Sequence, residues 1–155
     1  MEKALITNAD KLPVTHKNEH KNYEYFKKTI FSPSDGHKCA VSVYEIPPGK
    51  ANYPYHYHYQ NEEVFYIISG TGLLRTPDGE RAVAAGDILA FPACEAGAHK
   101  LTNASETERL VYIDFATFHS PEVCFYPDSN KTNVYGFGLS KITRNGTEVE
   151  YYDGE

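Results

Sequence analysis

Short runs rich in Val, Ile, Tyr and Phe alternate with Gly, Pro and Asp from residue 25 onward. Closely spaced apolar runs that are separated by turn residues are typical of an antiparallel sandwich or barrel. No long helical period, internal repeat or low-complexity tract interrupts them. The pattern predicts strands at residues 25–31, 39–45, 51–58, 63–69, 72–76, 81–84, 87–91, 97–102, 109–115 and 133–137. The chain is therefore predicted to be an all-β protein.

The start of the chain has a different composition. Residues 1–25 are dense in Lys, Asn and His and lack a sustained apolar period, so we expect an N-terminal arm that packs late or stays mobile. Residues 26–155 are expected to form a single domain, because 155 residues are short for two. With 41% apolar residues, a chain of this length buries roughly two-thirds of its unfolded surface.

The charge balance excludes several classes of partner. The chain has 15 Lys and Arg against 21 Asp and Glu, a net charge of −6, which does not favour nucleic acid or an anionic membrane. The longest apolar stretch, at residues 64–68, is far shorter than the roughly 20 residues of a membrane span, and the first residues show no signal-peptide pattern.

Cys39, Cys94 and Cys124 form no CxxC pair, so we expect free thiols in a cytoplasmic protein.

The first candidate metal ligands lie in the segment Tyr-Pro-Tyr-His-Tyr-His-Tyr at residues 53–59. His56 and His58 stand two residues apart on a predicted strand, so both imidazoles project from one face. Such a pair offers two nitrogen ligands to one metal ion. Glu62 and Glu63 follow within reach, and His99 comes after a separate predicted hairpin. Three imidazoles and one carboxylate are the candidate ligand set.

At these positions the chain resembles the cupin superfamily, whose two motifs are G(X)5HXH(X)3-4E(X)6G and G(X)5PXG(X)2H(X)3N. The residues that match are Gly49, His56, His58, Glu63 and Gly70 in the first motif, and Gly86, Pro92, His99 and Asn103 in the second. The wider resemblance covers roughly residues 40–131 and is to small single-domain bacterial cupins that are described as sugar-phosphate-isomerase-like. It implies a jelly-roll barrel, the double-stranded β-helix, with a metal held by His56, His58, Glu63 and His99.

The sequence departs from these motifs at two places. Six residues rather than five separate Gly49 from His56, an insertion that we expect in the preceding turn. Cys94 stands where the second motif has a glycine, and Gly97 is displaced toward His99. Cys94 is thus expected near the mouth of the site, either as a thiol that faces the substrate or as a small buried side chain.

Several side chains near the predicted metal site are open to two interpretations. Glu63 is preferred to Glu62 as ligand because it lies six residues before Gly70 and shares strand parity with Phe65 and Ile67. Arg75 is either a clamp for a carboxylate or phosphate or a solvated strand residue. Tyr112 shares parity with Leu110 and Asp114, opposite Val111, Ile113 and Phe115, and the pattern does not decide which set faces the interior.

The tyrosines at 53, 55, 57 and 59 are expected to pack against the second sheet or against a partner. His16, His20, His37 and His119 have no partner at ligand spacing, and Pro127-Asp128-Ser129-Asn130 is expected to be a turn over one end of the barrel.

Three functions remain open for such a metal site. Four protein ligands on an octahedral ion leave two positions for a small hydroxylated or sugar-like metabolite. The first hypothesis is isomerase, epimerase or lyase chemistry, with Glu62 and Tyr112 as the candidates for the base. The second is an iron-dependent dioxygenase, and the third is a non-catalytic module that binds a small ligand or metal. Fe, Mn, Ni, Zn and Co all suit the ligand set, and the resemblance implies a homodimer.

Overall fold

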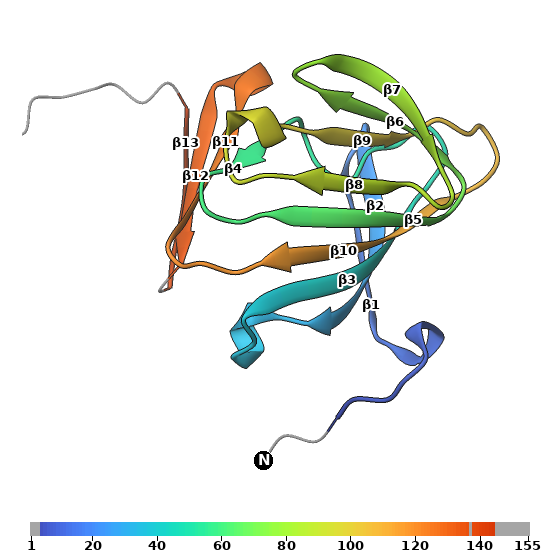
Figure 1. Cartoon of the computed structure of the whole chain (residues 1–155), viewed down its shortest axis with the longest axis horizontal. Helices are drawn as coiled ribbons and strands as arrows, with labels where there is room; N and C mark the ends of the chain where they lie inside the picture. Colours follow the sequence, from blue (N-terminus) through green and yellow to red (C-terminus); the bar gives the residue numbers. More distant parts are fainter. Residues whose placement is uncertain (1–3, 137, 145–155) are drawn as a thin grey trace, which may run out of the picture.

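The computed structural model describes residues 4–136 and 138–144, and strands make up most of it (Figure 1). No helix in this part of the chain is long and apolar enough to cross a membrane. Four short 3-10 turns accompany the strands: η1 (Ala9–Lys11), η2 (Pro33–Asp35), η3 (Glu95–Gly97) and η4 (Pro127–Ser129). The strands are β1 (Val14–His20), β2 (Tyr23–Phe31), β3 (Cys39–Ile46), β4 (Tyr57–His58), β5 (Glu63–Ser69), β6 (Thr71–Thr76), β7 (Gly79–Ala84), β8 (Ile88–Phe91), β9 (Lys100–Asn103), β10 (Leu110–Thr117), β11 (Glu122–Tyr126), β12 (Lys131–Gly136) and β13 (Leu139–Arg144).

These strands form one large sheet and two smaller ones. The six-stranded sheet has the order β1-β2-β3-β10-β5-β8, so β10 lies between β3 and β5. A four-stranded sheet, β13-β12-β11-β4, and a three-stranded sheet, β7-β6-β9, complete the barrel (Figure 1). All the strand pairs in these sheets are antiparallel. The all-β prediction is confirmed.

The interior is built by alternation along the strands. In β5, Phe65 and Ile67 are buried, whereas Val64, Tyr66 and Ile68 point outward and are exposed. The largest hydrophobic cluster consists of Tyr44, Ile46, Phe65, Ile67, Leu74, Val83, Leu89, Phe91, Leu101, Leu110 and Tyr112. These side chains fill the space between the six-stranded and three-stranded sheets.

The structure decides which face of β10 is internal. Leu110 and Tyr112 are fully buried, and Asp114 is 9% exposed. The inward-facing residues of β10 thus include the carboxylate of Asp114. The more uniformly apolar Val111, Ile113 and Phe115 face outward.

Several predicted boundaries differ from the observed ones. Residues 14–20 form β1, an edge strand paired with β2, although we predicted no strand before residue 25. The predicted strand at 51–58 is reduced to β4, and that at 97–102 is replaced by the end of η3 followed by β9. β11 and β13 were not predicted. The predicted strand at 133–137 lies in β12, except for Phe137, which is outside the described residues. Residues 1–3 and 145–155 are also outside the described residues.

Arg75 joins the turn at residues 127–130 to the rest of the barrel. Its Nη1 and Nη2 lie 2.7 and 2.8 Å from the two carboxylate oxygens of Asp128 in η4. Its guanidinium also lies over the ring of Tyr55, 4.0 Å from the centroid. Arg75 therefore binds a carboxylate of its own chain.

Candidate metal centre

The backbones of His56 and His99 are joined directly. Each residue donates its N–H to the carbonyl oxygen of the other, at 3.1 Å for the His56 N–H and 2.9 Å for the His99 N–H. This antiparallel bridge brings together the two motifs, which are far apart in the sequence. Two of the predicted ligands are thus fixed by main-chain hydrogen bonds.

The imidazole rings of His56 and His99 are oriented in the same way. The Nδ1 of His56 donates to the carbonyl oxygen of Pro54 at 2.8 Å, and the Nδ1 of His99 donates to that of Gly97 at 3.0 Å. Such outer hydrogen bonds fix the tautomer and leave the Nε2 lone pair free for a metal. Burial, aided by the charge of His99, lowers the pKa of His56 to about 3, so this imidazole is neutral and able to act as a ligand.

The Glu63 carboxylate stands between two of the histidines. Its Oε2 lies 3.4 Å from the Nε2 of His58 and 3.3 Å from the Nε2 of His99. Burial opposes its ionisation, but the neighbouring imidazoles outweigh burial and hold the pKa of Glu63 well below its usual value. Glu62, by contrast, is exposed, which agrees with the strand parity that favoured Glu63.

His58 differs from the other two imidazoles. Burial acts to lower its pKa, but the carboxylate of Glu63 outweighs burial and raises the pKa above its usual value. Its Nδ1 is buried and has no hydrogen-bond partner among the described residues. His58 thus has one nitrogen beside a carboxylate and another that no protein group satisfies.

These side chains fit a divalent transition metal. The donor atoms of His56, Glu63 and His99 lie within 4.8 Å of one another, and His58 adds a further imidazole beside Glu63. Glu63 Oε2 is buried without a hydrogen bond, and a bound cation would satisfy it. Imidazole and carboxylate donors together suit Fe, Mn, Ni, Zn or Co. Sequence reasoning proposed these four residues, and the structure brings them together.

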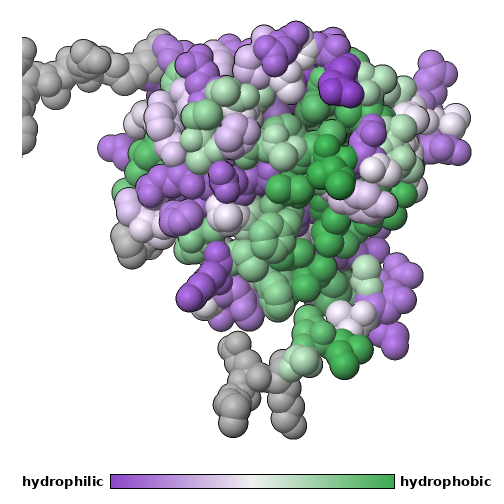
Figure 2. Space-filling model, in the orientation of Figure 1, coloured by the Kyte–Doolittle hydropathy of each residue, from purple (hydrophilic) through white to green (hydrophobic). Residues whose placement is uncertain are grey.

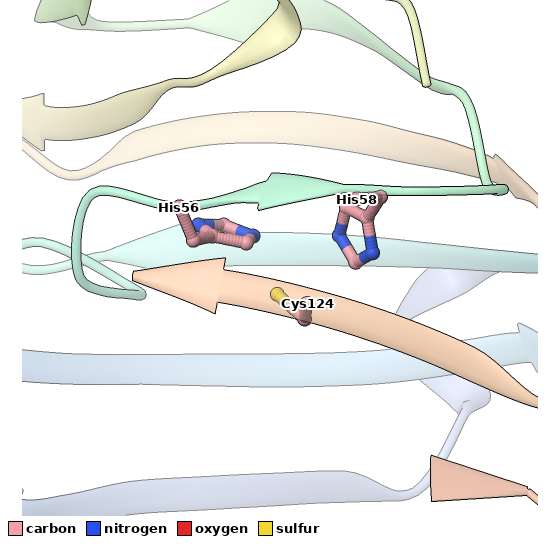
Figure 3. A group of neighbouring side chains, drawn as sticks. All are labelled: His56, His58 and Cys124. Atoms are coloured by element: carbon pink, nitrogen blue, oxygen red, sulfur yellow. The ribbon is translucent and has the colours of Figure 1, made fainter. Parts of the chain in front are cut away.

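A second donor group was not predicted from the sequence. Cys124, His56 and His58 also have donor atoms within 4.8 Å of one another (Figure 3). Burial raises the pKa of the Cys124 thiol to about 12. The residue lies in a strand that we did not predict, and for that reason no spacing rule connected it with the histidines.

Gly97 replaces the missing motif glycine. A Cβ on Gly97 would lie 2.0 Å from the carbonyl oxygen of Pro92, so only glycine permits this close approach. Cys94 precedes η3 with extended backbone angles and is exposed, and it does not line the cavity described below. Neither expectation for Cys94, a buried side chain or a thiol facing the substrate, describes its place.

Asn103, the last residue of the second motif, has a structural role. Its side-chain amide is buried and donates to the carbonyl oxygens of Ile46 and Glu108, both at 2.8 Å. Its Oδ1 accepts from the N–H of Ser105. Asn103 therefore holds the loop before β10 and does not face the donor atoms.

A cavity of about 640 Å³ opens beside the histidines. His56, His58, Glu63 and Cys124 line it, together with polar groups of the six-stranded sheet and β12. Asp114 contributes a carboxyl whose Oδ1 is buried without a hydrogen-bond partner. Burial and the charge of Glu63 raise the pKa of Asp114 well above its usual value, and Lys27 opposes them. Lys27 is the one lysine or arginine among the described residues that line this cavity.

The structure does not support the two expected candidates for the base. Glu62 is exposed, and its backbone N–H donates to Thr117 Oγ1. The hydroxyl of Tyr112 is fully buried and accepts a hydrogen bond from Asn52. Neither residue is among those that line the cavity, whereas Asp114 is.

The tyrosines of residues 53–59 serve mainly to pack this region. Tyr55 and Tyr57 are buried with Ala98, and Phe125 packs against them. The Tyr53 hydroxyl lies between those of Tyr44 and Tyr25. Tyr53, Tyr55 and Tyr57 thus pack inside the molecule, whereas Tyr59 is exposed.

The other histidines lie apart from the donor groups. His16 is 3.0 Å from Glu24, His37 packs on Phe31, and the backbone of His119 donates to Asn61. His20 lies on the edge strand β1, where its ring packs against Tyr23.

Comparison with known proteins agrees with this architecture. Residues 42–116, which span all four predicted ligands and most of the β3–β10 region, match the family model of the cupin domain. The chain thus contains a cupin domain and has the cupin jelly-roll fold. The family recognised from the two histidine motifs is confirmed. A search of curated proteins finds no match.

Among solved structures, a protein of Acidithiobacillus ferrooxidans that is provisionally named a sugar phosphate isomerase has a TM-score of 0.82 and 26% identity. The superposition covers 94% of this chain and 96% of that one. A cupin-superfamily protein of Silicibacter pomeroyi that is named a sugar phosphate isomerase has a TM-score of 0.80 and 18% identity, covering 95% and 98%. A polyketide cyclase of Streptomyces resistomycificus has a TM-score of 0.60 and 17% identity, covering 79% and 84%. The last two, at these identities, support the fold alone.

Proposed function

We propose that this protein is a metal-dependent isomerase or epimerase of small hydroxylated, sugar-like metabolites, with His56, His58, Glu63 and His99 as the metal ligands. One observation carries the proposal: three of these donors, His56, His58 and Glu63, line a 640 Å³ cavity that also contains a buried carboxyl, Asp114. The name of the Acidithiobacillus ferrooxidans protein, which is similar over nearly its whole length, supports the same class.

In this proposal Asp114 transfers the proton. A divalent ion at the four ligands supplies Lewis-acid polarisation of a substrate carbonyl. Asp114 removes the proton from the carbon beside that carbonyl, the electron pair of the C–H bond moves toward the carbonyl oxygen, and Asp114 returns the proton to a carbon of the same substrate. A carboxyl whose pKa is raised by burial is suited to this exchange near neutral pH.

Lys27 complements Asp114 in the same cavity. Its pKa is lowered, mainly by burial, while Asp114 and Glu63 act to raise it. We assign to Lys27 the contact with an acidic or strongly polar substituent of the substrate, because it is the lysine that lines the cavity.

The first experiment measures metal content per chain in protein that is purified without chelator. We expect about one metal per chain, lost in a His56→Ala/His58→Ala variant that retains its fold. That variant keeps the histidines of the N-terminal strand, so it separates the proposed site from adventitious binding. Absence of metal after reconstitution with each of Fe, Mn, Ni, Zn and Co would refute the proposal.

The second experiment incubates the metal-loaded protein anaerobically in D2O with a panel of aldoses, ketoses and their phosphates. We expect deuterium to enter the carbon beside the carbonyl of one of these compounds, as observed by proton NMR, and Asp114→Asn to abolish this exchange while it retains the metal. Oxygen consumption with bound iron and no anaerobic exchange would instead indicate a dioxygenase. A compound that binds tightly and is recovered unchanged would indicate a binding module.

We also propose that two copies pair through the outer face of the six-stranded sheet. Tyr66, Ile68, Ile88 and Phe115 are large apolar side chains exposed on this face, and hydrophobic residues gather over this part of the surface in Figure 2. Light scattering is expected to give the mass of a dimer, and Ile68→Lys is expected to convert it to a monomer. A monomeric wild type would refute the pairing.

A further inference from the structure

Cys124 lies on the same side of the barrel wall as the histidines. In the pairing of β11 with β4 it stands directly opposite His58, and opposed residues of antiparallel strands project from the same face. It is 2% exposed and lines the same cavity as His56, His58 and Glu63. Cys39 and Cys94 do not line this cavity. The backbone register thus directs one of the three thiols toward the donor atoms.

The distances agree with this register. The sulfur of Cys124 and a nitrogen from each of His56 and His58 lie within 4.8 Å of one another. Figure 3 shows the sulfur directed from β11 toward the space between the two rings. His56 also belongs to the group with Glu63 and His99, so the two donor groups share one residue.

An independent feature of His58 points to a ligand here. The Nδ1 atoms of His56 and His99 each donate to a carbonyl oxygen, but the Nδ1 of His58 is buried with no hydrogen-bond partner among the described residues. An unsatisfied buried nitrogen is unfavourable in a folded protein. The Nδ1 of His58 is therefore available to a ligand in this region.

We propose that Cys124 is a fifth metal ligand, which donates a thiolate sulfur on the cavity side of His56 and His58. This inference rests on the metal site of the proposed function. Coordination breaks the S–H bond and forms a sulfur–metal bond, and the proton leaves to solvent while the sulfur keeps the electron pair. A thiolate is the form of cysteine that binds a metal, so binding of the metal releases this proton.

A thiolate changes which metal the site prefers. Three imidazoles and one carboxylate accept hard and borderline ions, whereas sulfur favours Zn and Co over Mn. It also fills one of the two positions left open by four ligands on an octahedral ion. A substrate that chelates through two oxygens must then displace the sulfur, and Cys124 returns when the substrate leaves.

Cobalt(II) is the probe that tests this inference, because a sulfur–cobalt bond gives a charge-transfer absorption that nitrogen and oxygen ligands lack. Metal-free wild type, Cys124→Ser and Cys94→Ser are titrated with cobalt(II) in the absence of thiol reductants. We expect the absorption to saturate at one cobalt per chain in wild type and Cys94→Ser and to be absent in Cys124→Ser. A parallel titration should show that Cys124→Ser loses about tenfold or more in cobalt affinity and much less in manganese affinity.

The outcomes separate this inference from the proposed function. Stoichiometric cobalt binding without the sulfur absorption in wild type overturns the role of Cys124 and leaves the four-ligand site intact. Absence of cobalt binding in wild type overturns the role of Cys124, and absence of binding of Fe, Mn, Ni and Zn as well overturns the proposed function. Circular dichroism monitors folding, and Cys124→Ala serves where the serine variant fails to fold. An equal loss of cobalt and manganese affinity in a folded variant also counts against a thiolate ligand.

Discussion

Two neighbouring strands divide the barrel interior into a packed end and a hollow end. In β10 the inward side chains run from Leu110 through Tyr112 to Asp114, and in β5 they run from Ile67 to Glu63. The antiparallel register places the polar ends of both strands together, beside the cavity. The same alternation of side chains thus provides close packing at one end and unsatisfied polar groups at the other. Stability is concentrated away from the site, which can then carry groups that a packed core excludes.

The largest expected effect follows from breaking the packed end. Ile67 is completely buried, so Ile67→Ala removes apolar contacts and leaves a cavity. We expect it to lower the free energy of unfolding by roughly 2 to 5 kcal/mol, as measured by urea denaturation. Ile142→Ala is the matched control, because Ile142 is exposed on β13 and should change stability by about 0.5 kcal/mol or less. Equal losses in the two variants would refute this division.

The next effect falls on the hollow end alone. Gly97→Ala brings a Cβ against the carbonyl oxygen of Pro92, and the backbone must move together with the hydrogen bond that orients His99. We expect metal affinity to fall by about tenfold to a hundredfold, as measured by competition with a chelator. Ala96→Gly, one residue earlier at an exposed position, should leave the affinity unchanged. Unchanged affinity in Gly97→Ala would show that η3 does not position His99.

The third prediction concerns pH and the metal-free protein. The pKa of Asp114 is raised in the folded state, so its stabilising contribution is complete below the unfolded pKa of about 4 and is lost as pH rises through the folded pKa. Asp114→Asn removes this loss and is expected to gain about 1 kcal/mol of stability over wild type at neutral pH, with no gain near pH 4. Thermal denaturation across this range measures the difference. The exposed Asp78→Asn is the control, and a gain independent of pH would contradict the assignment.

The smallest effect is expected outside the barrel interior. Arg75→Ala removes the ion pair with Asp128 and the contact with the Tyr55 ring. Because the pair is partly exposed, we expect a loss of less than about 1 kcal/mol and no change in metal affinity. Urea denaturation and chelator competition measure the two quantities. A large loss of metal affinity would show that this contact helps to shape the site.

The sequence grouped ligand candidates that the structure brings close together, because several of them have a strong local pattern. The spacing of His56 and His58 places both on one face, and the parity of Glu63 with Phe65 and Ile67 distinguishes it from Glu62. Their convergence depends on the bridge between His56 and His99, which no local pattern specifies.

Other parts of the site could not be predicted because their signals were weak or misleading. Along β10 the more uniformly apolar set faces outward, so hydrophobicity alone does not identify Asp114 as internal. β1 is exposed along its whole length and polar after Val14, and it was missed as a strand. Cys124 reaches the histidines only through the pairing of β11 with β4, a contact between segments far apart in the sequence.

The hydrogen-bonded bridge between His56 and His99 has a consequence for folding. The two residues are far apart in the sequence, so their donor atoms meet only after the chain between them has folded back. Closing such a long loop is slow compared with forming a local hairpin. High-affinity metal uptake during refolding therefore cannot precede closure of the barrel at this point. The rate of metal uptake, compared with the rate at which the amides of residues 56 and 99 become protected from exchange, would report when this long-range step of folding occurs.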